Sequence, residues 1–157
     1  MKMLTLVFLI PFSLFAQAPV NGFVKKQSGP YFGLQQGKEV VLEIGFEKRI
    51  KEIQFKKPHT HAFDLGANYD FKRSVLGADL GYWYRPNRIG FTFGGVVALR
   101  SDFNRGVVGF SPTIGYKIWL LHANVGYYFY PNSLVSTNTL FLNLRLVLSD
   151  KTSFKRK

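Results

Sequence analysis

Apolar and polar side chains alternate in the segment that covers residues 139–149. Leucine occupies every second position from Leu140 to Leu148, whereas Asn143, Arg145 and Ser149 fall on the other set of alternate positions. Successive side chains of a β-strand point to opposite faces of its sheet. This segment therefore predicts a strand with one apolar face, and the same two-residue rhythm recurs through most of the chain.

The rhythm divides the chain into eight predicted strands joined by turns. The predicted strands cover residues 30–36, 39–48, 60–71, 74–84, 89–99, 106–117, 119–130 and 139–149. Gly37 permits the positive φ of a tight turn, and Pro86 suits a turn between the fourth and fifth strands. Residues 49–59 form the longest connection. No helical repeat follows the first 17 residues, so the sequence predicts an all-β fold.

Two points in this strand pattern are irregular. Pro112 lies inside the sixth strand and cannot donate a ladder hydrogen bond, so we expect a bulge or a local break there. The turn near residues 117–119 contains neither glycine nor proline and so gives no turn signal of its own.

The polar face holds nearly all of the strand glycines, and this decides which face lies inside. These glycines are Gly45, Gly66, Gly77, Gly81, Gly90, Gly94, Gly109, Gly115 and Gly126. Glycine weakens an ordinary solvent-facing strand, but inside a narrow barrel small residues make room for large neighbours. A soluble lipocalin-like barrel hides its apolar face, whereas a membrane barrel turns that face to lipid. The sequence favours a closed antiparallel up-and-down transmembrane β-barrel of about eight strands.

Charges of both signs share the inner face with the glycines. Because buried charges must pair, we expect an interior polar network. Its candidate members are Glu43, Asp64, Asp79, Arg100, Lys117, His122 and Arg145. A barrel of about eight strands is filled by side chains, so bulk diffusion through the interior is not expected.

Aromatic residues make up 17% of the chain and gather near the ends of the predicted strands. Such side chains favour the membrane–water boundary, where one edge of the ring is wet and the rest is apolar. The candidate interface residues are Tyr69, Tyr82, Tyr84, Phe91, Tyr127 and Phe129. Strands of about ten residues also match the tilted span that a bilayer requires.

The first residues have the features of a secretory signal. Lys2 is followed by an apolar run and then by Ala16-Gln17-Ala18, which predicts a signal peptide over residues 1–17, cut after residue 16 or 18. The alternative, an N-terminal core helix, is disfavoured by Pro11 inside the run. The remaining chain divides into an N-terminal periplasmic segment (18–29), a β-barrel (30–149) and a basic C-terminal tail (150–157).

Over residues 30–149 this pattern resembles the small eight-stranded outer-membrane barrels of Gram-negative bacteria. The signal ending in Phe15-Ala16-Gln17 is similar to those of many uncharacterised outer-membrane proteins of the Bacteroidota. The resemblance implies a location in the cell outer membrane, contact with lipopolysaccharide and phospholipid, and insertion by the outer-membrane assembly machinery. Such barrels usually finish on an aromatic residue. Here the last strand ends at Ser149, so either Phe154 takes that place or the tail is a periplasmic extension.

The charge and the cysteine content limit which partners and which chemistry we expect for the protein. The formal net charge is +12, and the basic residues cluster between the predicted strands and in the tail. There they suit anionic lipid headgroups or simply solvated loops. A secreted chain rarely meets nucleic acid, so we expect no such partner. The chain has no cysteine, which excludes disulfides, a thiol nucleophile and thiolate metal sites. We expect a monomer held by strand pairing.

No motif in the chain specifies a reaction. His59 and His61 share a strand face and suit a metal, but polar residues at a strand entry are the simpler interpretation. His122 faces inward as a candidate general base, but no His-x-Ser pair accompanies it. We therefore expect no catalytic, cofactor-binding or metal-binding residues and a structural or interaction role. A barrel-type lipid-modifying enzyme and a secreted soluble barrel that binds an apolar ligand are the alternatives.

Overall fold

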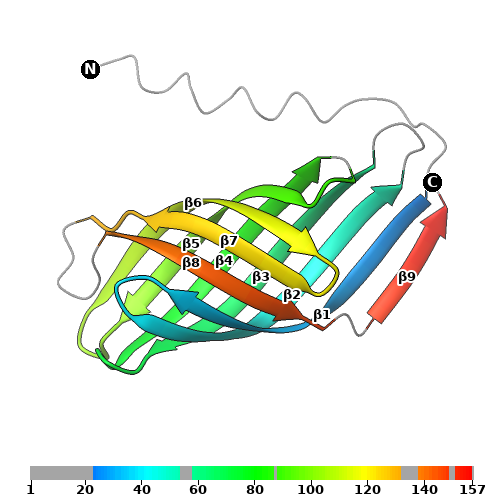
Figure 1. Cartoon of the computed structure of the whole chain (residues 1–157). Helices are drawn as coiled ribbons and strands as arrows, with labels where there is room; N and C mark the ends of the chain where they lie inside the picture. The colour runs from blue at the N-terminus through cyan, green and yellow to red at the C-terminus, as the bar shows by residue number, and fades with distance from the viewer. Residues whose placement is uncertain (1–22, 54–57, 87, 132–137, 149–150, 157) are drawn as a thin grey trace, which may run out of the picture.

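In a computed structural model of the chain, residues 23–53, 58–86, 88–131, 138–148 and 151–156 are described. They form nine antiparallel strands in one sheet, and eight of these strands close into a barrel (Figure 1). The strands are β1 (Phe23–Gln36), β2 (Val40–Ile53), β3 (His59–Asp70), β4 (Val75–Pro86), β5 (Phe91–Ser101), β6 (Gly106–Ile118), β7 (Leu121–Tyr128), β8 (Thr139–Val147) and β9 (Lys151–Arg156). The predicted signal peptide and its cleavage site lie outside the described residues.

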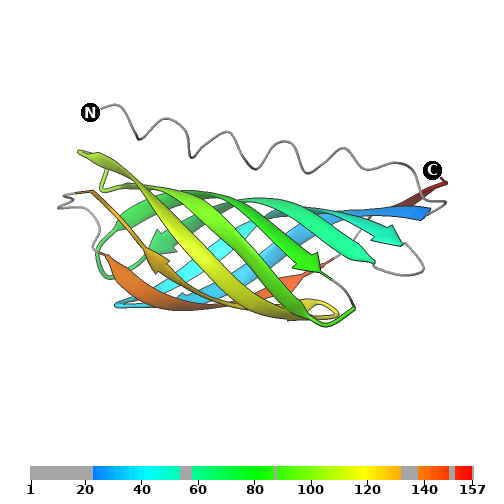
Figure 2. The same ribbon diagram turned by 90° about the horizontal axis from the view of Figure 1, so that it is seen from above.

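The barrel closes between its first and eighth strands. Each strand from β1 to β8 pairs with its neighbour in sequence, and β1 also pairs with β8, from Tyr31 opposite Val147 to Gln36 opposite Leu142. Figure 2 shows the strands winding obliquely around a common axis. The predicted closed antiparallel barrel of about eight strands is confirmed. Within the described residues, no helix has the length and apolar character needed to cross a membrane.

Two strands are longer than the alternation predicted. β1 begins at Phe23 rather than at residue 30, and β2 continues to Ile53 through much of the predicted 49–59 connection. The added halves pair with each other, with Phe23 opposite Ile53. They project beyond the β1–β8 closure at one end of the barrel (Figure 1).

Part of the predicted basic tail is also a strand. β9 pairs with the first half of β1, from Phe23 opposite Arg156 to Ser28 opposite Lys151. If the β8 register simply continued, Ser28 would face residue 150, so β9 is shifted by one residue. The shift puts Phe154 opposite Lys25, whose Nζ lies 5.4 Å from the Phe154 ring centroid. We call the first half of β1, the last part of β2 and β9 together the strand extension.

The irregularities at Pro112 and Trp119 take a specific form. β6 remains continuous and pairs with β5 through Pro112, which lies opposite Gly95. On its other side, the ladder to β7 stops at Thr113 and returns at Phe110, which pairs with Phe129 in the same register. The proline therefore causes a local break without a bulge. β7 begins at Leu121 rather than at residue 119, because Trp119 and Leu120 form the turn, with a φ of 50° at Trp119.

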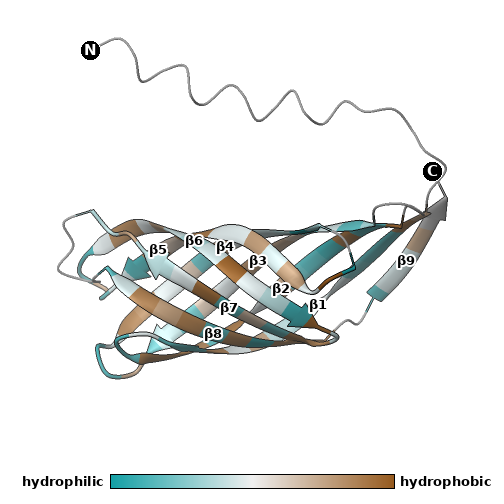
Figure 3. Ribbon diagram, turned by 45° about the horizontal axis from the view of Figure 1, so that its top comes forward, coloured by the Kyte–Doolittle hydropathy of each residue, from teal (hydrophilic) through white to brown (hydrophobic). Residues whose placement is uncertain are grey.

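The two faces of the barrel wall differ in chemistry. Apolar and polar residues alternate along the strands in Figure 3. Neighbouring residues of β4 show the contrast, because Leu80 is 58% exposed on the outer face whereas Asp79 is 1% exposed inside. Inside, glycines make room for large side chains: a Cβ on Gly45 would lie 2.5 Å from Cζ of the fully buried Tyr31.

Candidate functional site

Arg145 is the centre of the first polar network inside the barrel. Its Nη2 and Nε donate to the two carboxylate oxygens of Glu43 at 2.7 and 3.1 Å, and its Nη1 donates to Asp64 at 3.0 Å. The Tyr31 hydroxyl and the Asn143 amide donate to the same Glu43 carboxylate, each at 2.8 Å. The network links β1, β2, β3 and β8 across the barrel interior. A buried ion pair satisfied in this way holds strand positions relative to one another.

Arg100 is the centre of a second network, which lies nearer the end of the barrel opposite the strand extension. It binds both carboxylate oxygens of Asp79, which also accepts a hydrogen bond from Asn68 at 2.7 Å. Its Nη2 lies 3.2 Å from the Tyr128 hydroxyl, which in turn donates to Gln35 at 3.2 Å. All five residues are buried.

Glu47 organises a third group close to the strand extension. It accepts hydrogen bonds from Lys117 at 2.9 Å and from the Trp83 indole at 3.1 Å. Nε of Arg49 lies 2.9 Å from the same carboxylate. The charge of Glu47 is therefore shared between two cations. Glu47 lies on the inner face of β2, as the alternation predicts, although it is not one of the seven candidate network members.

His122 lies deep in the barrel and is fully buried. Its Nε2 is 2.9 Å from the Thr92 hydroxyl, and its ring packs edge-on against Trp83 at a centroid distance of 5.0 Å. Among the described residues, its Nδ1 has no hydrogen-bond partner. A general-base histidine is usually oriented by a carboxylate on its second ring nitrogen, and no such contact is found in the described part of the chain.

The interior is filled around these networks. The cavity between Asp64, Trp83 and Arg145 measures only about 10 Å³, about the space that one water molecule needs. At the end that holds the Arg100 network, a second cavity measures about 50 Å³. Neither offers a passage for a solute.

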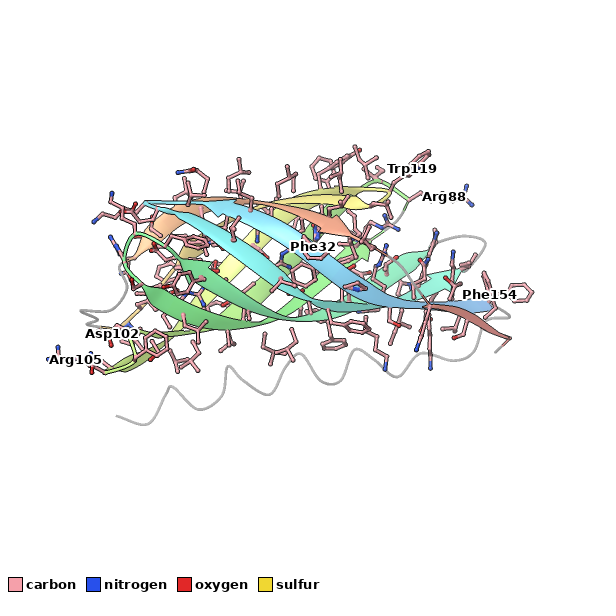
Figure 4. The ribbon with its side chains drawn as sticks, turned by 90° about the horizontal axis from the view of Figure 1, so that it is seen from below. Phe32, Arg88, Asp102, Arg105, Trp119 and Phe154 are labelled. Carbon is pink, nitrogen blue, oxygen red and sulfur yellow. The ribbon has the colours of Figure 1, made fainter. Side chains whose placement is uncertain are left out.

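A larger cavity opens at the other end of the barrel, where the strand extension begins. It measures about 320 Å³. Its lining consists of Lys25, Gln27, Arg49, Lys51, Thr60, Trp83, Arg85, Arg88, Lys117 and Trp119. We call it the basic cavity. Figure 4 shows Arg88 and Trp119 at the same end of the barrel as Phe154, with Asp102 and Arg105 at the opposite end. Lys117 is the one member of the predicted network that lines it.

His59 and His61 lie outside the barrel interior, on the outer face of β3. Their rings are 5.3 Å apart, His59 Nε2 is 3.5 Å from a carboxylate oxygen of Glu52, and His61 Nδ1 is 2.6 Å from the Tyr82 hydroxyl. No group of three or more His, Cys, Asp or Glu side chains in the described ranges is placed to hold a metal ion.

The candidate interface aromatics divide between the two ends of the barrel. Tyr82 and Tyr84 near the end of β4 lie toward the basic cavity, together with Phe91 at the start of β5. Tyr69 near the end of β3 lies at the opposite end, where Tyr127 and Phe129 also pack 4.8 Å apart. The structure thus places the six residues in two groups of three.

A scan against models of known protein families found no match, and a search among curated proteins found none either.

Proposed function

We propose that the protein is an outer-membrane β-barrel of a Gram-negative bacterium, with a structural or interaction role. The observation that carries the proposal is that the apolar face of the barrel wall points outward and the charged face points inward. Large apolar side chains such as Leu80 and Leu144 are more than half exposed, whereas charged ones such as Arg145 are buried. Soluble monomers rarely expose apolar patches larger than a few hundred Å². Lipid is the solvent that suits this outer face.

The aromatic residues support the same proposal. The groups at the two ends of the barrel flank a central outer band that includes Leu80 and Val97, which lie opposite each other on neighbouring strands. Membrane barrels carry such aromatic girdles on both sides of an apolar band about 25 Å tall. A tilted strand needs roughly nine to eleven residues to cross a bilayer. Strands β2 to β6 have 11 to 14 residues and so reach or exceed this length.

The strand extension suggests an orientation. Both described ends of the chain, at Phe23 and Arg156, lie opposite each other in it. We place this end in the periplasm. Lys26, Lys48 and Lys151 are exposed there on the side that continues the outer face of the barrel, where they suit the phosphates of phospholipid headgroups. Lipopolysaccharide would then surround the opposite end.

The filled interior favours a structural or interaction role over transport. Arg145 and Arg100 are each held by carboxylates, and the spaces beside them are no larger than about 50 Å³. Small barrels of this strand number have no aqueous channel.

Fractionation and gel mobility test this proposal together. The full chain is expressed with its signal in a Gram-negative host, membranes are washed with carbonate, and samples are run unboiled and boiled. We expect the protein in the washed outer-membrane fraction, with a mobility that changes on boiling because a folded barrel resists the detergent. A sample unfolded in urea before loading is the control for the boiled position. Recovery of the folded protein in the soluble fraction would contradict the proposal and favour a soluble barrel with an apolar ligand.

A further inference from the structure

We propose that the basic cavity is a binding site for an anion that carries one or more phosphate groups. Six cationic side chains from four strands and one turn converge on this one space of about 320 Å³. These side chains are Lys25, Arg49, Lys51, Arg85, Arg88 and Lys117. The described residues that line the cavity include no Asp or Glu.

The fold forces these cations together. Lys25, Arg49 and Lys51 lie on the same face of β1 and β2, since Lys25 and Lys51 are opposite each other in the register. Thr60 lies opposite both Lys51 and Arg85, so β3 brings the cations of β2 and β4 to one level. This face continues the inner face of the barrel beyond the closure between β1 and β8.

Glu47 contacts three residues of the cavity lining but does not neutralise the positive charge there. Its carboxylate is bound by Lys117 and Arg49, and Lys117 also lies 4.9 Å from the Trp83 ring. One negative charge thus stands against six positive charges. Deeper in the barrel the balance is different, because Arg145 and Arg100 together meet three carboxylates. Within the described structure this cavity gathers more cationic side chains than carboxylates: Lys117 is buried, Arg88 is exposed and the other four are half-buried.

The cations of the cavity also affect the pKa values of one another. Burial and the positive charges of Arg85, Lys25 and Arg88 lower the pKa of Lys51 below its ordinary value. Burial and the nearby Arg49 likewise lower the pKa of Arg85. Clustered cations of this kind destabilise the fold unless an anion joins them, since like charges repel most strongly where water is displaced.

Arg85 has donor groups that could bind the oxygens of an anion. Its Nη2 lies 3.4 Å from the Thr60 hydroxyl, whereas its Nε is buried and has no hydrogen-bond partner among the residues that the structure describes. A buried donor without a partner is costly. The planar fork of an arginine matches phosphate oxygens in pairs, and flexible lysines add point charges around them.

The size of the cavity favours an organic phosphate or a polyphosphate over a single phosphate ion. Sites for small molecules begin at about 300 Å³, which is close to the volume found here. Trp83 and Trp119 provide apolar surface beside the cations. Two sources share this chemistry: a soluble phosphate compound that enters from the barrel end, and a phospholipid headgroup that enters from the side.

Calorimetry with inorganic pyrophosphate tests the site. The purified, folded full chain is held in a neutral detergent without phosphate, and pyrophosphate is titrated at constant ionic strength. We expect saturable binding with a change in tryptophan fluorescence, because both tryptophans of the chain line the cavity. Substituting Lys51→Gln together with Arg85→Gln should weaken the affinity by about tenfold or more, since two charge-assisted contacts are lost.

A matched control separates the cavity from general attraction. Lys26→Gln with Lys48→Gln removes the same charge from the same end of the barrel, but these residues lie on the outer face. We expect this variant to bind as the wild type does. The cavity variant should also unfold at an equal or higher urea concentration, because its cations repel one another in the absence of ligand. A loss of stability in the cavity variant would instead indicate a structural role for these residues.

Nanodiscs distinguish the two sources. Phosphatidylglycerol in a phosphatidylcholine nanodisc should weaken pyrophosphate binding if a headgroup occupies the cavity. It should leave binding unchanged if the natural ligand is soluble. The proposal is overturned if pyrophosphate produces neither heat nor a fluorescence change in either setting, or if the outer-face variant loses as much affinity as the cavity variant.

Discussion

Arg145 and Glu43 are joined by two hydrogen bonds across the inside of the barrel, although they lie 102 residues apart in the sequence. Replacing Arg145 with methionine removes the only guanidinium that contacts both Glu43 and Asp64 among the described residues. Breaking a buried ion pair from one side costs about 3–5 kcal/mol, because the remaining charges stay buried. We expect a decrease of this size in the free energy of unfolding, measured by urea titration.

Arg105→Met is the control for this substitution. Arg105 is exposed in the turn between β5 and β6, at the end of the barrel opposite the strand extension. Its replacement should therefore change the unfolding free energy by less than about 0.5 kcal/mol. Equal stabilities of the two variants would show that the Arg145 network contributes nothing.

Gly66 and Tyr31 are expected to be coupled. A Cβ on Gly66 would meet the Tyr31 hydroxyl, so Gly66→Ala forces the ring to move and should cost about 1–3 kcal/mol. In the Tyr31→Phe background the obstructing oxygen is absent, and the same substitution should cost less. A double-mutant cycle measures this difference. Gly106→Ala is the control, because its nearest neighbouring atom would lie 3.9 Å away.

A depth series on the outer face separates lipid from water. If the barrel is in a bilayer, Leu80→Arg in the central band should cost about 2–4 kcal/mol, whereas Val40→Arg at the start of β2 should cost about 0–1 kcal/mol. Both residues are exposed, so in a water-soluble barrel neither substitution should matter. Unfolding titrations in lipid vesicles give the two values.

Anion binding in the basic cavity should weaken as the pH rises. The lowered pKa of Lys51 means that this side chain loses its proton at a lower pH than an ordinary lysine, whose pKa is 10.5. An anion favours the protonated form, so affinity is highest below the pKa of Lys51 and decreases as the pH passes through it. Sulfate is a suitable probe because its charge stays constant. In Lys51→Gln this decrease should become smaller, because Lys51 no longer contributes to it, and a wild-type affinity that is constant up to pH 10.5 would contradict the assignment.

The alternation of residues predicted the barrel because its walls separate two very different environments. Leu80 and Asp79 are neighbours that differ strongly in polarity, so the alternation alone assigns them to opposite faces of the wall. The same reasoning failed where both faces of a strand are polar. Lys25 and Lys26 lie on opposite faces of β1, so the beginning of that strand carries no periodic signal, and the strand was predicted to start too late.

The basic cavity was beyond sequence reasoning for a related reason. Arg49 and Arg85 were seen as residues of connections between strands, and only the register of β2, β3 and β4 brings them to one space. The turn after β6 was predicted near residues 117–119, but its exact position at Trp119 and Leu120 could not be predicted either. A tryptophan with positive φ is rare, and no residue preference in the sequence indicates it.

The layer formed by Glu47, Lys117 and Trp83 makes the two ends of the barrel different. It separates the basic cavity from the sealed interior, so a solute that enters at this end must leave by the same end. An anion bound in the basic cavity, as proposed, would therefore be accessible from one end of the barrel only. Any structural change that such an anion causes would reach the opposite end through the Arg145 and Arg100 networks, whose buried ion pairs connect strands on different sides of the barrel.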